Sequence, residues 1–299
     1  MAQPIPFGSR STADQVLAGI DLSRKRVLIT ECNSAIGIAT MKALSANGAV
    51  IIGVARTLDE AAVACSAVGR SSTPLGCVPA DLRSVDAAVE SLRRLSSPLD
   101  AVIINSFELQ CFADHIAQFV LVNRLAELVR YGTGRIVIGS NDASITEMPV
   151  ENAMFDDLNN ERIYDSQAFR GQTKLAAALF AQELSRQLKA RGVAVNAFHS
   201  RNRKSARHAG ERLMHSLLRY FRRSPAQSAA TPALLAASPL VVGITGEYWS
   251  NCQISQGSPL FTDAGLAKRL WDVSAQIAAM MSGRVNSPRA AGLAGENVD

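Results

Sequence analysis

Short apolar runs alternate with helical periodicity along most of the chain. The run RVLIT at Arg26–Thr30 is rich in β-branched residues and predicts a strand, and the apolar spacing over Ile36–Asn47 predicts a helix. A second apolar run, Ala49–Arg56, completes a βαβ unit with a right-handed crossover. Strands rich in Val and Ile that alternate with helices are typical of a parallel sheet covered on both faces. The pattern therefore predicts an α/β fold, a doubly wound parallel sheet of the Rossmann type in a single domain.

The alternation continues toward the C-terminus. Further strands are expected at Pro74–Leu82, Leu99–Asn105, Gly134–Ser140, Gly192–His199 and, as a short final strand, Gly246–Asn251. Helices are expected at Ser84–Leu95, Cys111–Tyr131, Gln167–Arg191 and Pro225–Ala237. Ligands of such sheets bind at the carboxyl ends of the strands, so we expect the functional site there.

The length of 299 residues favours one folded unit with less structured ends. We expect an N-terminal lead-in over residues 1–22 and the folded domain over residues 23–281. A Gly- and Ala-rich tail over residues 282–299 has little apolar surface to bury, so we expect it to be disordered.

Composition narrows the class of protein. Hydrophobic residues make up 47% of the chain, but no apolar run reaches the roughly 18 residues of a membrane span. The N-terminus lacks the apolar core of a secretory signal, and the five cysteines follow neither a disulfide nor a metal-ligand pattern, so we expect a cytoplasmic protein without a metal. A net charge of +5 with only 5% aromatic residues argues against a nucleic-acid partner.

Several segments resemble the short-chain dehydrogenase/reductase family, and its retinol-dehydrogenase-like members in particular, from about Ser11 to Ile277. They read STADQVLAGIDLS, VARTLDEA, PADLRSV, GRIVIGS, YDSQAFRGQTKLAAALFAQELSRQL and GEYWSNCQISQGSPLFTDAGLAKRLWDVS. The resemblance implies the Rossmann-type fold, a dinucleotide cofactor and a homodimer formed through the helices at Cys111–Tyr131 and Gln167–Arg191. Function depends on the site rather than on the fold.

The phosphate-binding loop departs from the family motif TGGxxGIG. Here the segment reads TECNSAIG, with Glu31, Cys32 and Ala35 at the glycine positions and only Gly37 retained. Glycines serve there because the backbone must approach the pyrophosphate closely. A carboxylate at Glu31 would repel that phosphate, unless its side chain points to solvent.

The family's loop after the fourth strand is also shortened. The family has NNAG and about a dozen further residues, whereas Asn105 and Ser106 lead directly into FELQ. Two other residues match cofactor-binding positions of the family. The resemblance places Arg56 where relatives bind the 2′-phosphate of NADP, and Asp81 in the pair of residues that contacts the adenine. The alternative is that Arg56 is a solvated loop residue and Asp81 a helix N-cap. We expect that no cofactor binds. The cofactor that the retained residues would suit is NADP, and these residues are Gly37, Arg56, Asp81 and Asn105.

The family's catalytic Asn, Ser, Tyr and Lys are mostly replaced. The resemblance places Lys174 on the lysine, Arg170 on the tyrosine and Asp114 on the asparagine, while Asn141 replaces the catalytic serine and Ser140 matches the non-catalytic serine before it. Were Arg170 an insertion, Phe169 would take the tyrosine position. Neither side chain can act as a phenolic acid.

The replacements bring charge into the old pocket. Arg170 and Lys174 lie four residues apart, on one face of the expected helix, where like charges repel unless an anion lies between them. Asp114 paired with Lys174 would leave Arg170 to bind an anionic small molecule, and the alternative is a purely structural ion-pair cluster. A basic segment from Arg201 to Arg212 replaces the family's Pro-Gly turn and would form either a solvated face or an electropositive mouth.

Three functions remain open. The first, which the sequence favours, is an enzyme of natural-product biosynthesis that catalyses a non-redox step such as cyclisation, isomerisation or dehydration. The second is an NADPH-dependent reductase of an activated C=N or C=C bond. The third is a non-catalytic binding protein.

Overall fold

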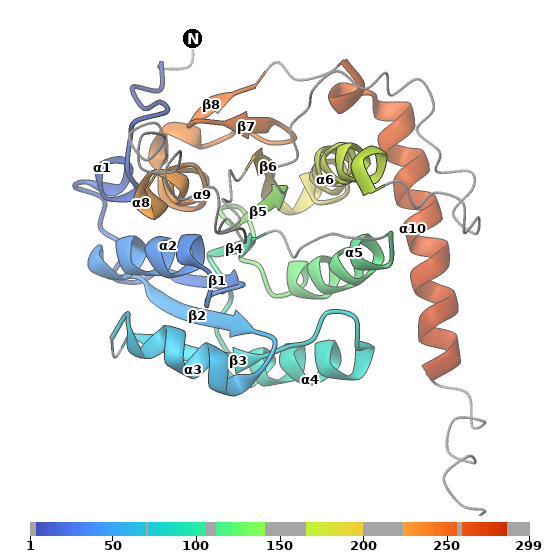
Figure 1. The fold of residues 1–299 in the computed structure, drawn as a ribbon, viewed down its shortest axis with the longest axis horizontal. Helices are drawn as coiled ribbons and strands as arrows, with labels where there is room; N and C mark the ends of the chain where they lie inside the picture. Colours follow the sequence, from blue (N-terminus) through green and yellow to red (C-terminus); the bar gives the residue numbers. More distant parts are fainter. Residues whose placement is uncertain are drawn as a thin grey trace, which may run out of the picture.

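One eight-stranded sheet forms the centre of the molecule in the computed structural model, which describes residues 4–69, 71–105, 112–140, 166–199, 224–255 and 259–285 (Figure 1). The strand order is β3-β2-β1-β4-β5-β6-β7-β8, with all neighbours parallel except the antiparallel pair of β7 and β8. The strands are β1 (Arg26–Thr30), β2 (Val50–Ala55), β3 (Ser72–Gly76), β4 (Ala101–Ile104), β5 (Arg135–Ser140), β6 (Ala194–His199), β7 (Tyr248–Ser250) and β8 (Gln253–Ile254). The doubly wound α/β fold is thus confirmed.

Helices cover both faces of this sheet (Figure 1). One face carries α1 (Ala13–Leu17), α2 (Ala35–Ala46), α3 (Leu58–Ser66), α8 (Pro225–Ser228) and α9 (Ala230–Ala237). The other carries α4 (Leu82–Arg93), α5 (Phe112–Ala126), α6 (Ser166–Gln187) and α10 (Ala264–Val285). Short 3₁₀ turns lie at Lys189–Arg191, Pro239–Val241 and Pro259–Thr262. Because β1 lies between β2 and β4, the chain direction across the sheet reverses there, and the carboxyl ends of β1 and β4 form the switch point at which such folds bind ligands.

One expected strand and three expected helices differ from the structure. The strand expected at Pro74–Leu82 is β3 at Ser72–Gly76, and it is an edge strand that stays half exposed rather than buried. Cys77 after it is buried, Val78 and Ala80 are exposed, and Asp81 caps α4 instead of ending the strand. The helix expected at Pro225–Ala237 divides at Ala229 into α8 and α9, and the two long helices end a few residues early, at Ala126 and Gln187.

The ends of the chain contribute to the same core. Val16 and Leu17 of α1, inside the expected lead-in, are buried against α2 and α9. At the other end α10 continues through Val285, past the boundary at residue 282, and residues 286–299 lie outside the described part. None of the helices described is long and apolar enough to cross a lipid bilayer.

Helix α10 covers the face formed by α5 and α6 (Figure 1). Trp271 of α10 packs its ring 4.9 Å from that of Phe119 and 5.9 Å from that of Phe180. His115 is buried beside the Phe180 ring, and its Nε2 lies 3.0 Å from Ser274 Oγ. Burial lowers the pKa of His115 to about 4, so its imidazole is neutral near pH 7. Helix α10 therefore packs on the two helices through which the homodimer is expected, and the homodimer stays a prediction.

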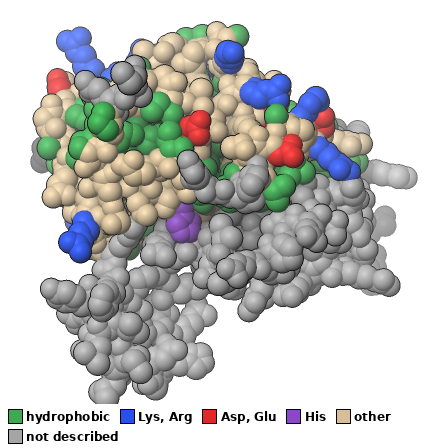
Figure 2. All heavy atoms as spheres, turned by 90° about the horizontal axis from the view of Figure 1, so that it is seen from above, with side chains coloured by type: hydrophobic (Ala, Val, Ile, Leu, Met, Phe, Trp, Pro, Cys, Tyr) green, Lys and Arg blue, Asp and Glu red, His purple; other side chains and the backbone are tan. Residues whose placement is uncertain are grey.

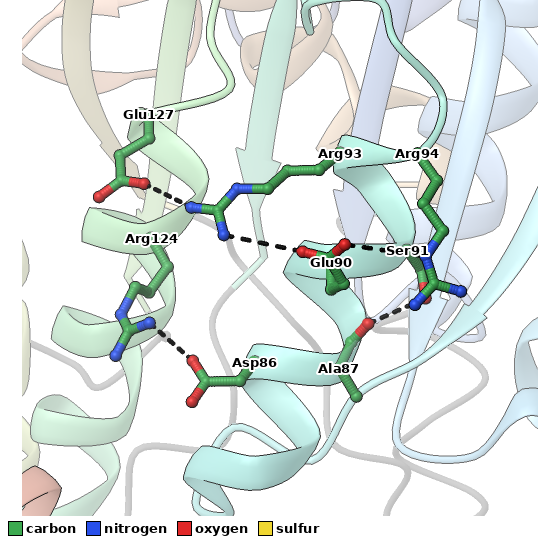
Figure 3. A network of polar contacts seen from close by, with 8 residues as sticks. All are labelled: Asp86, Ala87, Glu90, Ser91, Arg93, Arg94, Arg124 and Glu127. Atoms are coloured by element: carbon green, nitrogen blue, oxygen red, sulfur yellow. Dashed lines mark hydrogen bonds and ion pairs between the residues drawn. The ribbon is translucent and has the colours of Figure 1, made fainter.

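Exposed ion pairs join α4 to α5 (Figure 3). Arg93 lies 2.8 Å from Glu127, and Arg124 lies 2.7 Å from Asp86. Pairs that are this exposed contribute little to stability. On the face seen in Figure 2, the Lys and Arg side chains of the described residues are scattered among uncharged and hydrophobic ones. That part of the surface therefore offers no continuous basic stripe of the kind that tracks a nucleic-acid backbone.

Candidate functional site

Two buried residues join β1 to β4 at the switch point. Asn105 Nδ2 donates to the carbonyl oxygen of Thr30 at 2.8 Å, and Thr30 Oγ1 donates to the carbonyl oxygen of Asn105 at 3.4 Å. Both side chains are almost completely buried, so these bonds form in a low-dielectric environment and hold the two strand ends in register. Asn105, expected to contact a cofactor, therefore uses its amide to link the strands.

The turn from β1 into α2 has an unusual backbone at Glu31. Its φ is +47°, in the left-handed region that favours glycine, and holding a non-glycine residue there costs roughly 1 kcal/mol. The backbone N–H of Cys32 donates to the Val54 carbonyl oxygen at 3.1 Å and that of Ser34 donates to the Glu31 carbonyl oxygen at 3.0 Å. The turn thus keeps the backbone conformation of a glycine although the residue is a glutamate.

Gly37 shows why the last glycine of the motif is retained. A Cβ at this position would collide with the carbonyl oxygen of Glu31 and lie 3.0 Å from Cys32 Cα. Its N–H donates to Ser34 Oγ, the N-cap of α2, at 2.9 Å. Gly37 therefore packs the helix against the turn, a role that does not require a bound phosphate.

The side chains of this turn differ from the glycines of the family motif. Cys32 points into the core, where burial raises the pKa of its thiol to about 12 and keeps it protonated. Glu31 is half-buried and brings a carboxylate to the N-terminal end of α2, where the family offers backbone N–H groups to a phosphate. The expectation that no dinucleotide binds here stays a prediction.

The adenosine side of the groove is more permissive. Arg56 follows β2 and is exposed, as the family's NADP position requires. Asp81 accepts a hydrogen bond from the Arg83 N–H at 2.9 Å and so acts as the N-cap of α4. The capping role is the alternative weighed for Asp81 from the sequence, and the cofactor roles of these residues stay predictions.

Two hydroxyl groups meet between the last residue of β5, Ser140, and the first residue of β7, Tyr248. Ser140 Oγ lies 3.1 Å from the Tyr248 hydroxyl and 3.3 Å from the Phe198 carbonyl oxygen. If Ser140 donates to that carbonyl, the Tyr248 O–H must donate to Ser140. The Tyr248 ring packs 4.8 Å from the ring of Phe261, and both hydroxyl-bearing residues are buried.

Tyr248 is absent from the sequence-based candidates. A tyrosine at the start of the short strand β7 carries no motif of its own, and it lies 108 positions after Ser140 in the sequence. The available signal is topological: β7 pairs with β6, which pairs with β5, so the start of β7 comes near the carboxyl end of β5. His199, in register with Ser140, ends β6 at the same edge.

The residues expected to be catalytic are only partly described. Asp114 lies in the first turn of α5, and Arg170 and Lys174 lie one turn apart in the N-terminal part of α6. The two helices pack against each other, but the side chains of these three residues lie outside the described part, as do Asn141 and the basic segment from Arg201 to Arg212. Their proposed pairing and roles therefore stay predictions.

Comparisons with known proteins agree with the fold. No protein-family model matches the chain. It is 32% identical over 299 residues to the WW domain-containing oxidoreductase of Drosophila melanogaster, covering 91% of this chain and 73% of the relative. It is 30% identical over 289 residues to human retinol dehydrogenase 14, covering 84% and 85% of the two chains, and 29% identical to the chloroplastic short-chain dehydrogenase TIC 32 B of Brassica napus, covering 91% and 94%.

Solved structures give the same fold at lower identity. An uncharacterized protein of Mycobacterium paratuberculosis superposes with a TM-score of 0.64 at 22% identity, covering 90% of this chain and 97% of the other. A short-chain type dehydrogenase/reductase of Mycobacterium marinum gives 0.57 at 17% identity, covering 78% and 96%. Together with the retained strand order and the relatives at 30% identity or more, these similarities show that the chain belongs to the short-chain dehydrogenase/reductase family.

Proposed function

We propose that this chain is an enzyme derived from short-chain dehydrogenases that binds a small polar or anionic molecule at the carboxyl edge of its sheet and catalyses a step without net redox change. Cyclisation, isomerisation and dehydration are the reaction classes in view, and natural-product biosynthesis is the setting. The observation that carries the proposal is Glu31, a carboxylate held at φ +47° in the phosphate turn. The strand ends around it keep the geometry of a binding site through Thr30 and Asn105.

The residues of the old pocket would divide the work as follows. Arg170 anchors a carboxylate, enolate or developing oxyanion, because its guanidinium stays protonated and offers a fork of N–H donors. Asp114 acts as the acid or base, and Lys174 balances its charge. Asn141 orients the ligand by hydrogen bonds. No step of this chemistry uses a nicotinamide.

Ser140 and Tyr248 support the strand ends beside this pocket. Ser140 donates to the Phe198 carbonyl oxygen and lies 3.1 Å from the Tyr248 hydroxyl, so both hydroxyl groups are engaged inside the protein. A buried neutral pair of this kind holds the strands in place and leaves contact with the ligand to the other residues.

An NADPH-dependent reductase of an activated C=N or C=C bond is the second candidate. Arg56 supports it, since this exposed arginine has no acidic partner within ion-pair distance in the described part of the chain. The similar proteins carry the names oxidoreductase and dehydrogenase, which also favours redox chemistry. A non-catalytic binding protein is the third candidate.

Calorimetric titration with NADPH and NADH separates these functions. We expect no binding at micromolar concentrations, because the Glu31 carboxylate opposes the pyrophosphate. Two variants test the cause: Glu31→Gln removes the charge but keeps the side chain's size, and Glu31→Gly combined with Ala35→Gly restores two of the three glycines that the motif has lost. NADPH binding should be strongest in the double variant, and micromolar binding by the unmodified chain would overturn the proposal in favour of the reductase.

Binding of the anionic substrate is tested with a thermal-shift panel of hydroxy acids and keto acids. Compounds that stabilise the unmodified chain should lose their effect in Arg170→Ala, while Arg83→Ala on the exposed part of α4 serves as the matched control. Where turnover is found, Asp114→Asn should lower kcat more than it changes KM. An Arg170→Ala variant that keeps every ligand shift and only melts earlier would make Arg170 structural.

A further inference from the structure

A cavity of about 500 Å³ lies at the amino edge of the sheet, opposite the family's site. It opens between the starts of β1, β4, β5 and β6, whose residues Val27, Ala101, Arg135 and Ala194 contribute to its wall. The C-terminal ends of α6 and α9 close two sides of it. Its volume is within the range of small-molecule sites, and none of the residues expected at the carboxyl edge lines it.

The charge of the wall is positive. Lys25, Arg135 and Lys189 line the cavity, and Asp100 is the acid among the lining residues. That acid is already saturated: Lys25 Nζ lies 3.2 Å and Arg130 Nε 2.8 Å from its carboxylate. Its other oxygen accepts from the Arg26 backbone N–H at 3.0 Å. The Asp100 carboxylate is therefore already engaged and does not balance the charges of Arg135 and Lys189.

Arg135 is held in place without a carboxylate. Its NH1 donates to the carbonyl oxygens of Leu235 and Ser238, at 3.2 and 2.8 Å, where α9 ends. Burial lowers the pKa of this guanidinium, yet an arginine stays protonated in proteins. Within the described residues, neither Arg135 nor the exposed Lys189 has an acid within ion-pair distance.

The rest of the wall is apolar. Leu22, Val27 and Val241 are buried against the sheet, and Val242 stands at the rim with 70% of its surface exposed. Thr245, one of the polar lining groups, is occupied by hydrogen bonds to the backbone of Val195. A ligand that suits this wall has one negative group for the two cations and an apolar body for the remaining surface.

We propose that this amino-edge cavity binds a small amphipathic monocarboxylate, with its carboxylate between Arg135 and Lys189 and its apolar chain against Leu22, Val27 and Val241. Arg135 supplies a charge-assisted hydrogen bond from a position fixed by the α9 carbonyls. The site is independent of the function proposed for the carboxyl edge, because the two lie at opposite ends of the strands.

Octanoate is the probe, titrated by calorimetry, with 1-octanol as the uncharged control of equal chain length. Octanoate should bind and octanol should bind at least tenfold more weakly. Arg135→Gln should weaken octanoate about tenfold, the value of a hydrogen bond to a charged group. Lys189→Ala should weaken it about threefold, and raising the salt concentration should weaken it further, because a half-exposed ion pair is screened.

Two controls keep the result decisive. Lys42→Ala, an exposed lysine of α2 away from the cavity, should leave octanoate affinity unchanged, and so should Arg83→Ala on α4. If Arg135→Gln fails to fold because the α9 carbonyls lose their donor, Lys189→Ala still tests the proposal, since Lys189 is exposed. Absence of octanoate binding at millimolar concentration, equal affinity for octanol, or an unchanged affinity in Lys189→Ala would overturn it.

Discussion

The two edges of the sheet are built from different interactions. At the carboxyl edge, the pairs Thr30–Asn105 and Ser140–Tyr248 are neutral hydrogen bonds, buried almost completely. At the amino edge, Asp100 is surrounded by cations whose side chains remain 41 to 45% exposed. Neutral buried bonds change little with pH and salt, whereas the charged cluster depends on both. The edge that the family uses for chemistry is therefore the one whose scaffold is insensitive to solution conditions.

The difference extends to the backbone. The carboxyl edge holds strain in the turn at Glu31, and Gly37 packs directly on that strained residue. Strained backbone persists where the surrounding structure over-determines it, and it is concentrated at functional sites. The turn has therefore kept the family's shape after losing the residues that made this shape easy to adopt.

Gly37→Ala should have the largest effect on stability. The new Cβ meets backbone atoms of Glu31 and Cys32, which cannot rotate away, so we expect a loss of about 3 kcal/mol in the free energy of unfolding. Gly8→Ala is the control, because a Cβ there meets no atom within 4 Å. Urea denaturation measures both. A Gly37→Ala variant as stable as Gly8→Ala would mean that the turn is not held as tightly as the structure indicates.

Asp100→Asn should have the next largest effect, about 2 kcal/mol, because two cations and a backbone N–H lose a charged acceptor. Burial alone would raise the pKa of Asp100, but the hydrogen bonds from Arg130, Arg26 and Lys25 outweigh it and lower the pKa. A lowered folded-state pKa gives stability that is present above about pH 4, the ordinary value for an aspartate, and is lost as the pH falls further.

Urea denaturation between pH 7 and pH 3 tests this sign. The unmodified chain should lose stability at the acid end more steeply than Asp100→Asn, and 1 M salt should narrow the gap between them. Glu127→Gln, which breaks the exposed pair between Glu127, the residue after α5, and Arg93 of α4, is the matched control and should change stability by no more than about 0.5 kcal/mol. Parallel acid profiles for the unmodified chain and Asp100→Asn would contradict the assignment.

Sequence patterns predicted the strands and helices that are buried completely or along one face. The run RVLIT gave the bounds of β1 without error, and the strand expected at Gly134–Ser140 differs from β5 by one residue. β3 was displaced because an edge strand is only partly buried, so its residues do not form a continuous apolar run. Periodicity predicts burial, and it fails where burial is partial.

Residues of the site could be predicted from the sequence only where they belong to a family motif. The loss of glycine at Glu31 could be read from TECNSAIG, but the retained φ of +47° depends on packing against Gly37 and on the bond from Cys32 to β2. The pairing of Ser140 with Tyr248 depends on strand order across three neighbouring strands. The covering of α5 and α6 by α10 depends on tertiary packing that no local pattern encodes.

The smallest expected effect belongs to the Ser140–Tyr248 pair, and it tests the comparison most directly. Tyr248→Phe removes one neutral hydrogen bond while the ring keeps its packing on Phe261, so we expect a loss of about 1 kcal/mol. Ser140→Ala should cost a similar amount, and the double variant should lose less than the sum, because the two share one bond.

The pair should also behave as a neutral scaffold element. The double-mutant coupling between Ser140 and Tyr248 should be the same at pH 5 and pH 8 and in 0.1 and 1 M salt, because the bond joins two uncharged hydroxyl groups and neutral dipoles are weakly screened. The effect of Asp100→Asn should shrink in 1 M salt over the same experiments. A coupling between Ser140 and Tyr248 that falls with salt as steeply as the Asp100 effect would place a charge beside the hydroxyl pair, and the contrast between the two edges would then fail.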